Sequence, residues 1–447
     1  MARVSSEAPA VSRRNLLRAA AATTAAAGAL AGGAAAAEPD ARRRSGGGGR
    51  KFHGVVRLGE AIEVRELTLL PPGDFDVVVR TSASPLCYSI ARGLLSRRSV
   101  EQPELVGHAA VGVVEDVGAM VKRVRPGDQV IVAGTPLCGQ CYNCTRGRWD
   151  HCEFVVVGGL PKLPRAEFLA GGARMQVAGD AVIGGLSEVT IAREEYLSLV
   201  VTKLDPAELA LLGDTIGCGF ATITNYEPPQ VGQNVVVFGA GPVGIGAIQA
   251  ARLTGAGQII VVEPVEARRA LATKLGATTV LDPNVEGDGL VEKIRQMCSG
   301  PNDRVFAGGR TQGRPTAFGA DFTVEAVGDS LVSPRSTTGP DPRGISVMRQ
   351  AWEVTRAGGH YATMGLFSPG DVSFPADQYA RRARTHHASQ AGNMNILRDL
   401  PNYVRMTERG ELDVRSVVTA RPRMDETLAA AKAVADRSTV AAVTVID

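Results

Sequence analysis

The sequence contains four cysteines within one short run, CGQCYNCTRGRWDHC, separated by two, two and seven residues. This spacing lets a single loop surround a tetrahedral metal ion, and four thiolates leave a zinc ion no open position. The run therefore predicts a structural zinc site formed by Cys138, Cys141, Cys144 and Cys152. Two disulfides or four unrelated thiols are the alternative, which fits less well because gaps this short favour a shared ion over mutual bridging.

The composition indicates an ordinary globular protein of more than one domain. The chain has 447 residues, of which 44% are hydrophobic and 21% charged, enough to bury two cores. A formal net charge of +3 gives no electrostatic reason to expect nucleic acid as a partner.

The N-terminus has the features of an export segment. Arg13 and Arg14 precede a weakly apolar, alanine-rich run that ends at Ala34–Ala37, which resembles a twin-arginine signal with an Ala-x-Ala cleavage site. An alanine-rich surface helix or a membrane anchor is the alternative, although glycines interrupt the run and large aliphatic residues are few. We expect a signal at 1–37 that is read by the export machinery, then a flexible linker at 38–50. The mature protein is expected to be periplasmic, extracellular or in the cell envelope, without a stable membrane span.

Two patterns of hydrophobic residues follow one another along the rest of the chain. Residues 53–200 contain short apolar runs separated by Pro-Gly and Gly-Asp turns, which favour antiparallel strands in a barrel-like domain. From about residue 224 a strand–helix–strand series begins, with a helix expected from Val243 to about Thr254. That series predicts a doubly wound parallel sheet.

A glycine-rich motif, G-x-G-x-x-G, lies where the first of these strands meets its helix. Glycines at its three fixed positions allow a tight turn and close approach of a pyrophosphate to backbone N–H groups; the motif residues are Gly239, Gly241, Pro242, Val243 and Gly244.

The end of the next strand carries the residue that distinguishes the two nicotinamide dinucleotides. Glu263 can bind both ribose hydroxyls and would repel a 2′-phosphate, so NAD is favoured over NADP. Arg268, about one helical turn later, is expected either to contact the adenosine end or to be solvated.

These segments together resemble the zinc-containing medium-chain dehydrogenases, the alcohol dehydrogenase family. The resemblance is carried by VVVRTSASPLCYS, ELVGHAAVGVVEDVG, the cysteine run, DTIGCGFATITNY and VVVFGAGPVGIGAIQ, in the family's order. It implies a GroES-like, mostly β barrel catalytic domain at 51–222, a Rossmann NAD-binding domain at 223–386 and a C-terminal return to the first domain at 387–447. It also implies a homodimer or homotetramer.

The resemblance further implies a catalytic zinc held by Cys87, His108 and Cys218, two thiolates and an imidazole with one open position. Ser89 matches the position whose hydroxyl passes the substrate proton outward, although an ordinary loop serine is the alternative. Thr222 and Val243 match positions that line the nicotinamide.

Several positions depart from the family pattern. The carboxylate that usually follows the ligand histidine is replaced by Ala109, and the aspartate three residues after the first cysteine ligand is replaced by Ile90. Loss of such acidic partners weakens metal binding or activity by about 10 to 100-fold. Tyr88 and Arg92 also replace residues of the pyrophosphate contact and the proton relay, and the basic residue usual before the last strand is absent, with Arg437 the nearest substitute.

We therefore expect an exported zinc enzyme that transfers hydride between a small-molecule alcohol, or its aldehyde or ketone, and NAD. Because free dinucleotides are scarce outside the cytoplasm, tightly bound NAD is expected. The alternatives are a zinc-independent reductase that keeps only the Cys138 site, and a non-catalytic nucleotide-binding or redox-sensing protein. Two segments rich in Gly, Pro, Arg and Thr, 299–320 and 329–344, read as added surface loops, either of which could cover the cofactor.

Overall fold

The computed structural model describes residues 49–96, 100–154, 163–179, 183–299, 318–328, 345–367 and 371–446, which belong to one compact unit. The predicted signal and nearly all of the linker lie outside these residues, as do most of the first predicted loop and the whole of the second. Among the described helices, none is both long and apolar enough to cross a membrane.

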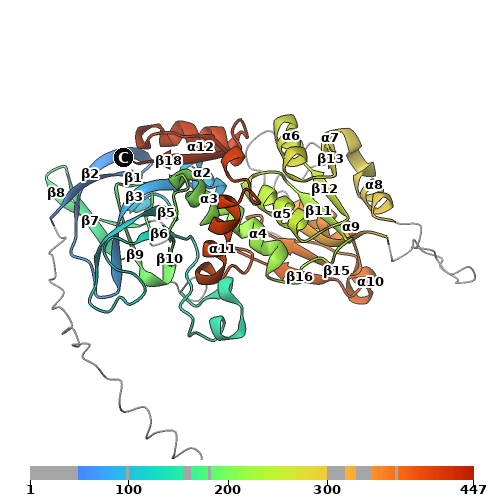
Figure 1. Cartoon of the computed structure of the whole chain (residues 1–447). Coiled ribbons are helices and arrows are strands. Elements are labelled where there is room, and N and C mark those ends of the chain that lie inside the picture. The colour runs from blue at the N-terminus through green and yellow to red at the C-terminus, as the bar shows by residue number, and fades with distance from the viewer. Residues whose placement is uncertain are drawn as a thin grey trace, which may run out of the picture. The chain divides into compact units, whose positions relative to one another are not determined.

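The first part of the chain forms a closed barrel with a second sheet packed beside it (Figure 1). The barrel strands, in their paired order, are β1 (Lys51–Gly59), β2 (Ala61–Leu69), β7 (Pro164–Ala170), β8 (Ala173–Gly179) and β4 (Val100–Leu105). The second sheet has the order β10 (Leu197–Leu199), β6 (Gln129–Val132), β5 (Ala110–Val117), β3 (Asp76–Pro85), β18 (Ala441–Val445) and β17 (Val418–Ala420), and β9 (Val189–Arg193) also pairs with β3.

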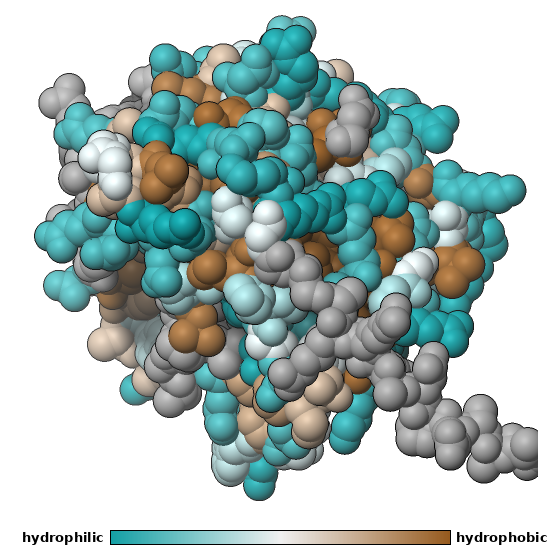
Figure 2. All heavy atoms as spheres, turned by 90° about the vertical axis from the view of Figure 1, so that its left-hand side faces the viewer, coloured by the Kyte–Doolittle hydropathy of each residue, from teal (hydrophilic) through white to brown (hydrophobic). Residues whose placement is uncertain are grey.

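Alternation along β3 explains how two cores form here. Val77 and Val79 pack into one buried cluster, whereas Val78 faces the cluster of Phe52 and Leu67 inside the barrel. Successive side chains of a strand point to opposite faces, so a run of valines can serve both. On the barrel side of the molecule, hydrophobic residues lie scattered among hydrophilic ones (Figure 2).

The second part of the chain forms a parallel sheet. Its strand order is β13 (Thr279–Leu281), β12 (Gln258–Val262), β11 (Asn234–Phe238), β14 (Ala320–Glu325), β15 (Thr355–Thr363) and β16 (Thr385–Ala388), and every neighbouring pair is parallel.

Helices cover both faces of this sheet, as the strand–helix series predicts. Val235 and Val237 face the cluster of α5 (Pro242–Leu253) and α6 (Glu266–Leu275). Val236 and Phe238 face the opposite cluster, with α8 (Leu290–Met297) and α9 (Ile345–Val354). The remaining α-helices are α2 (Tyr88–Leu95), α3 (Pro206–Leu212), α4 (Thr215–Thr224), α7 (Pro283–Glu286), α10 (Ala376–Arg381), α11 (Ile396–Glu408) and α12 (Thr427–Ala435).

The C-terminal segment returns to the first sheet. Val443 of β18 lies opposite Pro85 of β3 in an antiparallel pair. Pro85 comes two residues before Cys87. The segment predicted to return to the first domain, 387–447, contains α11, α12 and β18. The GroES-like and Rossmann fold is therefore confirmed, while the domain limits stay predictions.

Candidate active site

The four cysteines of the zinc loop come together as the spacing predicts. Their ligand atoms all lie within 4.8 Å of one another, and all seven cysteines of the chain are free of disulfides. Backbone N–H groups of Cys141 and Cys144 point at the sulfurs of Cys138 and Cys141, 3.3 and 3.4 Å away. Hydrogen bonds to sulfur favour the thiolate, so the donor set fits a structural zinc ion.

A second group of metal-binding type contains Cys87, His108 and Asp214, with ligand atoms again within 4.8 Å of one another. Each comes from a different place in the fold: Cys87 precedes α2, His108 follows β4, and Asp214 lies between α3 and α4. His108 Nε2 lies 3.3 Å from Asp214 Oδ1.

Asp214 occupies the N-cap position of α4 but does not cap it. Aspartate at this position normally accepts a hydrogen bond from the first turn, whereas this side chain accepts none. The residue is buried, and its Oδ2 has no hydrogen-bond partner. An unpaired buried carboxylate oxygen costs free energy unless a cation satisfies it, so this donor set also fits a zinc ion.

The charges of this group act on His108. Burial opposes protonation of the imidazole, but the neighbouring Asp214 carboxylate and Cys87 outweigh it and hold the pKa of His108 well above its usual value.

Cys218, the expected third ligand, is not a member of this group among the described residues. It lies four residues after Asp214, within α4, so both residues belong to the same part of the fold. Burial, followed by the charges of Asp214 and Cys87, raises the pKa of the Cys218 thiol. Cys218 therefore stays a predicted ligand, and Asp214, which sequence reasoning missed, is a further candidate for the same ion.

Ile90 and Ala109, two departures from the family pattern, are both buried. They leave no carboxylate at their own positions. The Asp214 carboxylate, which lies beside His108, is the one carboxylate of this group.

The glycine motif forms the turn between β11 and α5. Gly239 has φ +91, a left-handed conformation that favours glycine, and a Cβ at Gly244 would overlap the carbonyl oxygen of Gly239. Pro242 begins α5, whose N-cap is Gly241. This is the geometry in which helix N–H groups bind a pyrophosphate, so the residues fit the NAD that the motif predicts.

Glu263 follows β12 and faces this turn. Its carboxylate accepts hydrogen bonds from Ala240 N, at 2.8 Å, and from Val265 N, at 2.9 Å, and it is 3% exposed. Each oxygen keeps a further lone pair for a ribose hydroxyl.

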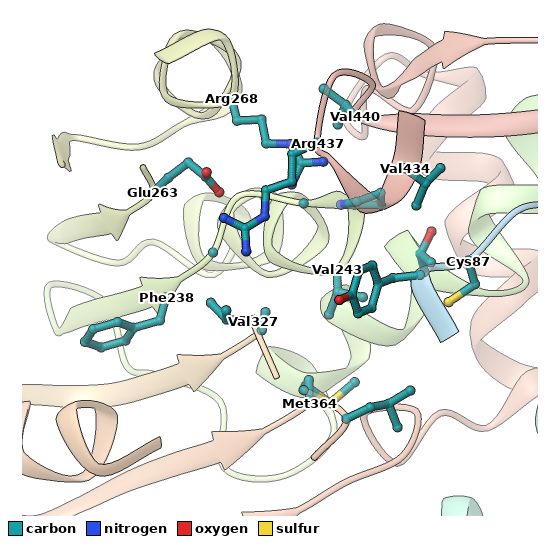
Figure 3. Close-up of a pocket in the computed structure, with 18 of the residues that line it drawn as sticks. Cys87, Phe238, Val243, Glu263, Arg268, Val327, Met364, Val434, Arg437 and Val440 are labelled. Carbon is teal, nitrogen blue, oxygen red and sulfur yellow. The ribbon is translucent and has the colours of Figure 1, made fainter. Parts of the chain in front are cut away.

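Arg268 is buried and lines the cavity. Its Nη2 donates to the carbonyl oxygen of Thr439, 2.8 Å away, and burial lowers its pKa. Arg437, with φ +66, lies beside it, and both line the pocket across from Glu263 (Figure 3).

One cavity of about 210 Å³ connects the two halves of the site. Glu263 and Cys87 lie toward its opposite ends, with Val243 between them (Figure 3). The buried hydroxyls of Ser89 and Thr215 line it without a hydrogen-bond partner. Thr222 is fully buried and its hydroxyl donates to the carbonyl oxygen of Cys218, so its contact with a nicotinamide stays a prediction.

Two family models match the chain. Residues 73–202 match the alcohol dehydrogenase GroES-like domain and residues 242–337 the zinc-binding dehydrogenase domain, together half of the sequence.

Curated relatives match over most of their length. An S-(hydroxymethyl)glutathione dehydrogenase of Photobacterium damsela subsp. piscicida is 26% identical over 82% of this chain and 92% of its own. An NDMA-dependent alcohol dehydrogenase of Amycolatopsis methanolica is 28% identical over 82% of this chain and 91% of its own.

A solved structure shares the fold. The benzyl alcohol dehydrogenase of Acinetobacter calcoaceticus superposes with a TM-score of 0.72 at 22% identity, covering 89% of this chain and all of that one.

Fold and site together define a zinc- and NAD-dependent oxidoreductase of the alcohol dehydrogenase type. The chain belongs to the zinc-containing medium-chain dehydrogenase/reductase family.

Proposed function

We propose that Cys87, His108 and Asp214 hold the catalytic zinc, and that the enzyme interconverts a small-molecule alcohol and its aldehyde or ketone. The observation that carries this assignment is the unpartnered Oδ2 of Asp214, buried beside His108. When bound, zinc supplies a Lewis acid to the substrate oxygen and NAD accepts or donates the hydride.

The chain's own residues orient the two reactants. The turn at Gly239–Gly244 would hold the pyrophosphate of NAD and Glu263 its ribose, in the cavity that Val243 and Cys87 also line. The unpaired hydroxyls of Ser89 and Thr215 lie in the same cavity. One of them can accept a hydrogen bond from the substrate hydroxyl, and Ser89 can pass its proton outward.

Zinc content tests the ligand set. We expect two zinc ions per chain in the purified protein by elemental mass spectrometry, one in the Asp214→Asn variant, and two in Cys218→Ser. Turnover with a panel of alcohols and NAD, alone and with an added electron acceptor for a tightly held cofactor, should fall about 10 to 100-fold or more in Asp214→Asn.

Two zinc ions in Asp214→Asn and one in Cys218→Ser would instead identify Cys218 as the third ligand of the catalytic zinc. One zinc ion in the unaltered protein, with turnover that resists a chelator, would favour the zinc-independent reductase. One zinc ion and no turnover would favour the non-catalytic protein.

We also propose export by the twin-arginine route, on the strength of Arg13 and Arg14 before the alanine-rich run. Because this route carries folded proteins, zinc can be loaded in the reducing cytoplasm before the thiols meet an oxidising compartment. Cell fractionation should find the protein outside the cytoplasm, and the double substitution Arg13→Lys with Arg14→Lys should retain it inside. Unchanged distribution would overturn the proposal.

A further inference from the structure

The loop of the Cys138 site contains a buried acid that contacts another part of the molecule. Asp150 lies between two of the cysteine ligands, in a short 3-10 helix, Trp149–His151, and is 1% exposed. Its Oδ2 accepts hydrogen bonds from Ser389 Oγ and Asn393 N, each at 3.0 Å. Tyr226 OH and Gln390 N approach the same oxygen at 3.2 and 3.3 Å. A buried carboxylate needs such donors, so the loop is fixed on segment 389–393.

The side chain of Asn393 also binds the backbone of the zinc loop. Its Oδ1 accepts a hydrogen bond from Trp149 N at 2.7 Å, and its Nδ2 donates to the carbonyl oxygen of Gly147 at 2.8 Å. The residue has φ +54, a left-handed conformation that asparagine tolerates better than most residues. Its amide therefore holds two points of the zinc loop at once.

The other side of this segment rests on α4. The carbonyl oxygen of Asn393 accepts a hydrogen bond, 3.1 Å long, from Nδ2 of Asn225, the C-cap residue of that helix. A Cβ at Gly392 would overlap the carbonyl oxygen of Cys218 and crowd the backbone nitrogen of Thr222. The segment and the helix are thus in direct contact.

The same helix presents Asp214 to the second metal group. We propose that Asp150 and Asn393 are positioning residues, which transmit the shape of the Cys138 loop through segment 389–393 to α4 and so set where Asp214 lies. The closed metal site then controls the geometry of the open one. This inference rests on the proposed role of Asp214 in the catalytic site.

Two substitutions isolate the link. Asp150→Asn removes the charge at constant size, and Asn393→Gly keeps the left-handed backbone while deleting both side-chain hydrogen bonds. Asp321→Asn is the matched control, because Asp321 is also a buried acid that accepts a backbone hydrogen bond, from Asn234 N, but lies on β14 of the parallel sheet.

Two measurements read the geometry without relying on turnover. In protein with cobalt at the catalytic site, the visible absorption bands should shift in both variants, and cobalt affinity should fall by about 10-fold or more. In Asn393→Gly without the catalytic metal, the alkylation rate of Cys218, followed by peptide mass spectrometry, should change at least 2-fold, whereas in Asp150→Asn the lost charge also acts on this thiol directly. The control should lower the thermal midpoint while leaving both readings as in the unaltered protein.

Unchanged bands and unchanged alkylation in Asp150→Asn and Asn393→Gly, with only a lower thermal midpoint, would overturn the inference and leave the network a source of stability. If the unaltered protein takes up no second cobalt ion, the proposed function fails, and the alkylation of Cys218 still decides whether the link exists.

Discussion

The two metal groups of this protein are built in opposite ways. The Cys138 group takes all its ligands from a single short loop, and Cys144 and Cys152 are buried. The Cys87 group gathers one residue from each of three distant segments, leaves one carboxylate oxygen unpaired, and lines a cavity. A closed group of this kind serves folding, whereas a group with an open position serves chemistry.

The difference shows how ligand sets arise. When all ligands come from one short loop, their spacing in the sequence determines which residues bind the metal. A site assembled from separate segments takes whichever side chain the packing brings near, and here a helix offers two candidates four residues apart, Asp214 and Cys218.

We expect the largest effect on stability from a substitution that destroys the Cys138 zinc site. Cys152→Ser should release the structural zinc and lower the thermal midpoint by about 10 °C or more, because structural zinc binding contributes directly to folding free energy. Calorimetry with elemental analysis measures both. Cys298→Ala, which alters a buried thiol outside both groups, should keep two zinc ions. A stable Cys152→Ser protein with two zinc ions would break the comparison.

A chelator should remove the zinc ions of the two groups at different rates. His108 and Cys87 are partly exposed, so a chelator should remove one zinc ion and reduce turnover by about 10-fold or more while circular dichroism stays unchanged. The second ion should leave later, together with the fold. Release in the reverse order would mean that the open group is the structural one.

A third local site, the glycine turn, should respond to a single added methyl group. Gly244→Ala places a Cβ against the carbonyl oxygen of Gly239, so the turn must shift and NAD binding by calorimetry should weaken by about 10-fold or more. Gly289→Ala meets nothing within 4 Å and should bind NAD normally. Equal binding by both variants would show that the turn does not hold the pyrophosphate.

The smallest effect concerns a long-range contact without a ligand. Arg421 binds both oxygens of Asp205, at 3.1 and 2.7 Å, and this hydrogen bonding lowers the pKa of Asp205. Asp205→Asn keeps the cap of α3 but loses the ion pair, and should cost about 0.5 kcal/mol at neutral pH.

The pH dependence of that cost follows from the lowered pKa. The stabilisation is present above the unfolded pKa of about 3.9 and is lost as the pH falls through the lower folded value. The difference in thermal midpoint between Asp205→Asn and the unaltered protein should therefore shrink below about pH 4. A difference that grows in acid would contradict this assignment.

Much of the fold was predictable because its signals are local. The expected helix from Val243 to about Thr254 is present as Pro242–Leu253, since the glycine turn marks its start. The zinc loop follows from its spacing in the same way.

Asp214 was not predictable by such means. The sequence predicts that an aspartate before a helix is an N-cap. Only the structure shows that the Asp214 carboxylate lies beside His108 and makes no hydrogen bond to the first turn of α4. The burial of Arg268 against Thr439 likewise depends on a contact between segments far apart in the sequence.

The pairing of β18 with β3 also determines when the sheet beside the active site can finish folding during synthesis. Pro85, at the end of the strand before Cys87, pairs with Val443, a residue that is synthesised long after it. The sheet that supports the open metal group therefore stays unfinished until β18 has been synthesised, because a contact between two distant segments forms only after everything between them exists. A nascent chain of this protein has the cysteine loop long before it has a finished active site.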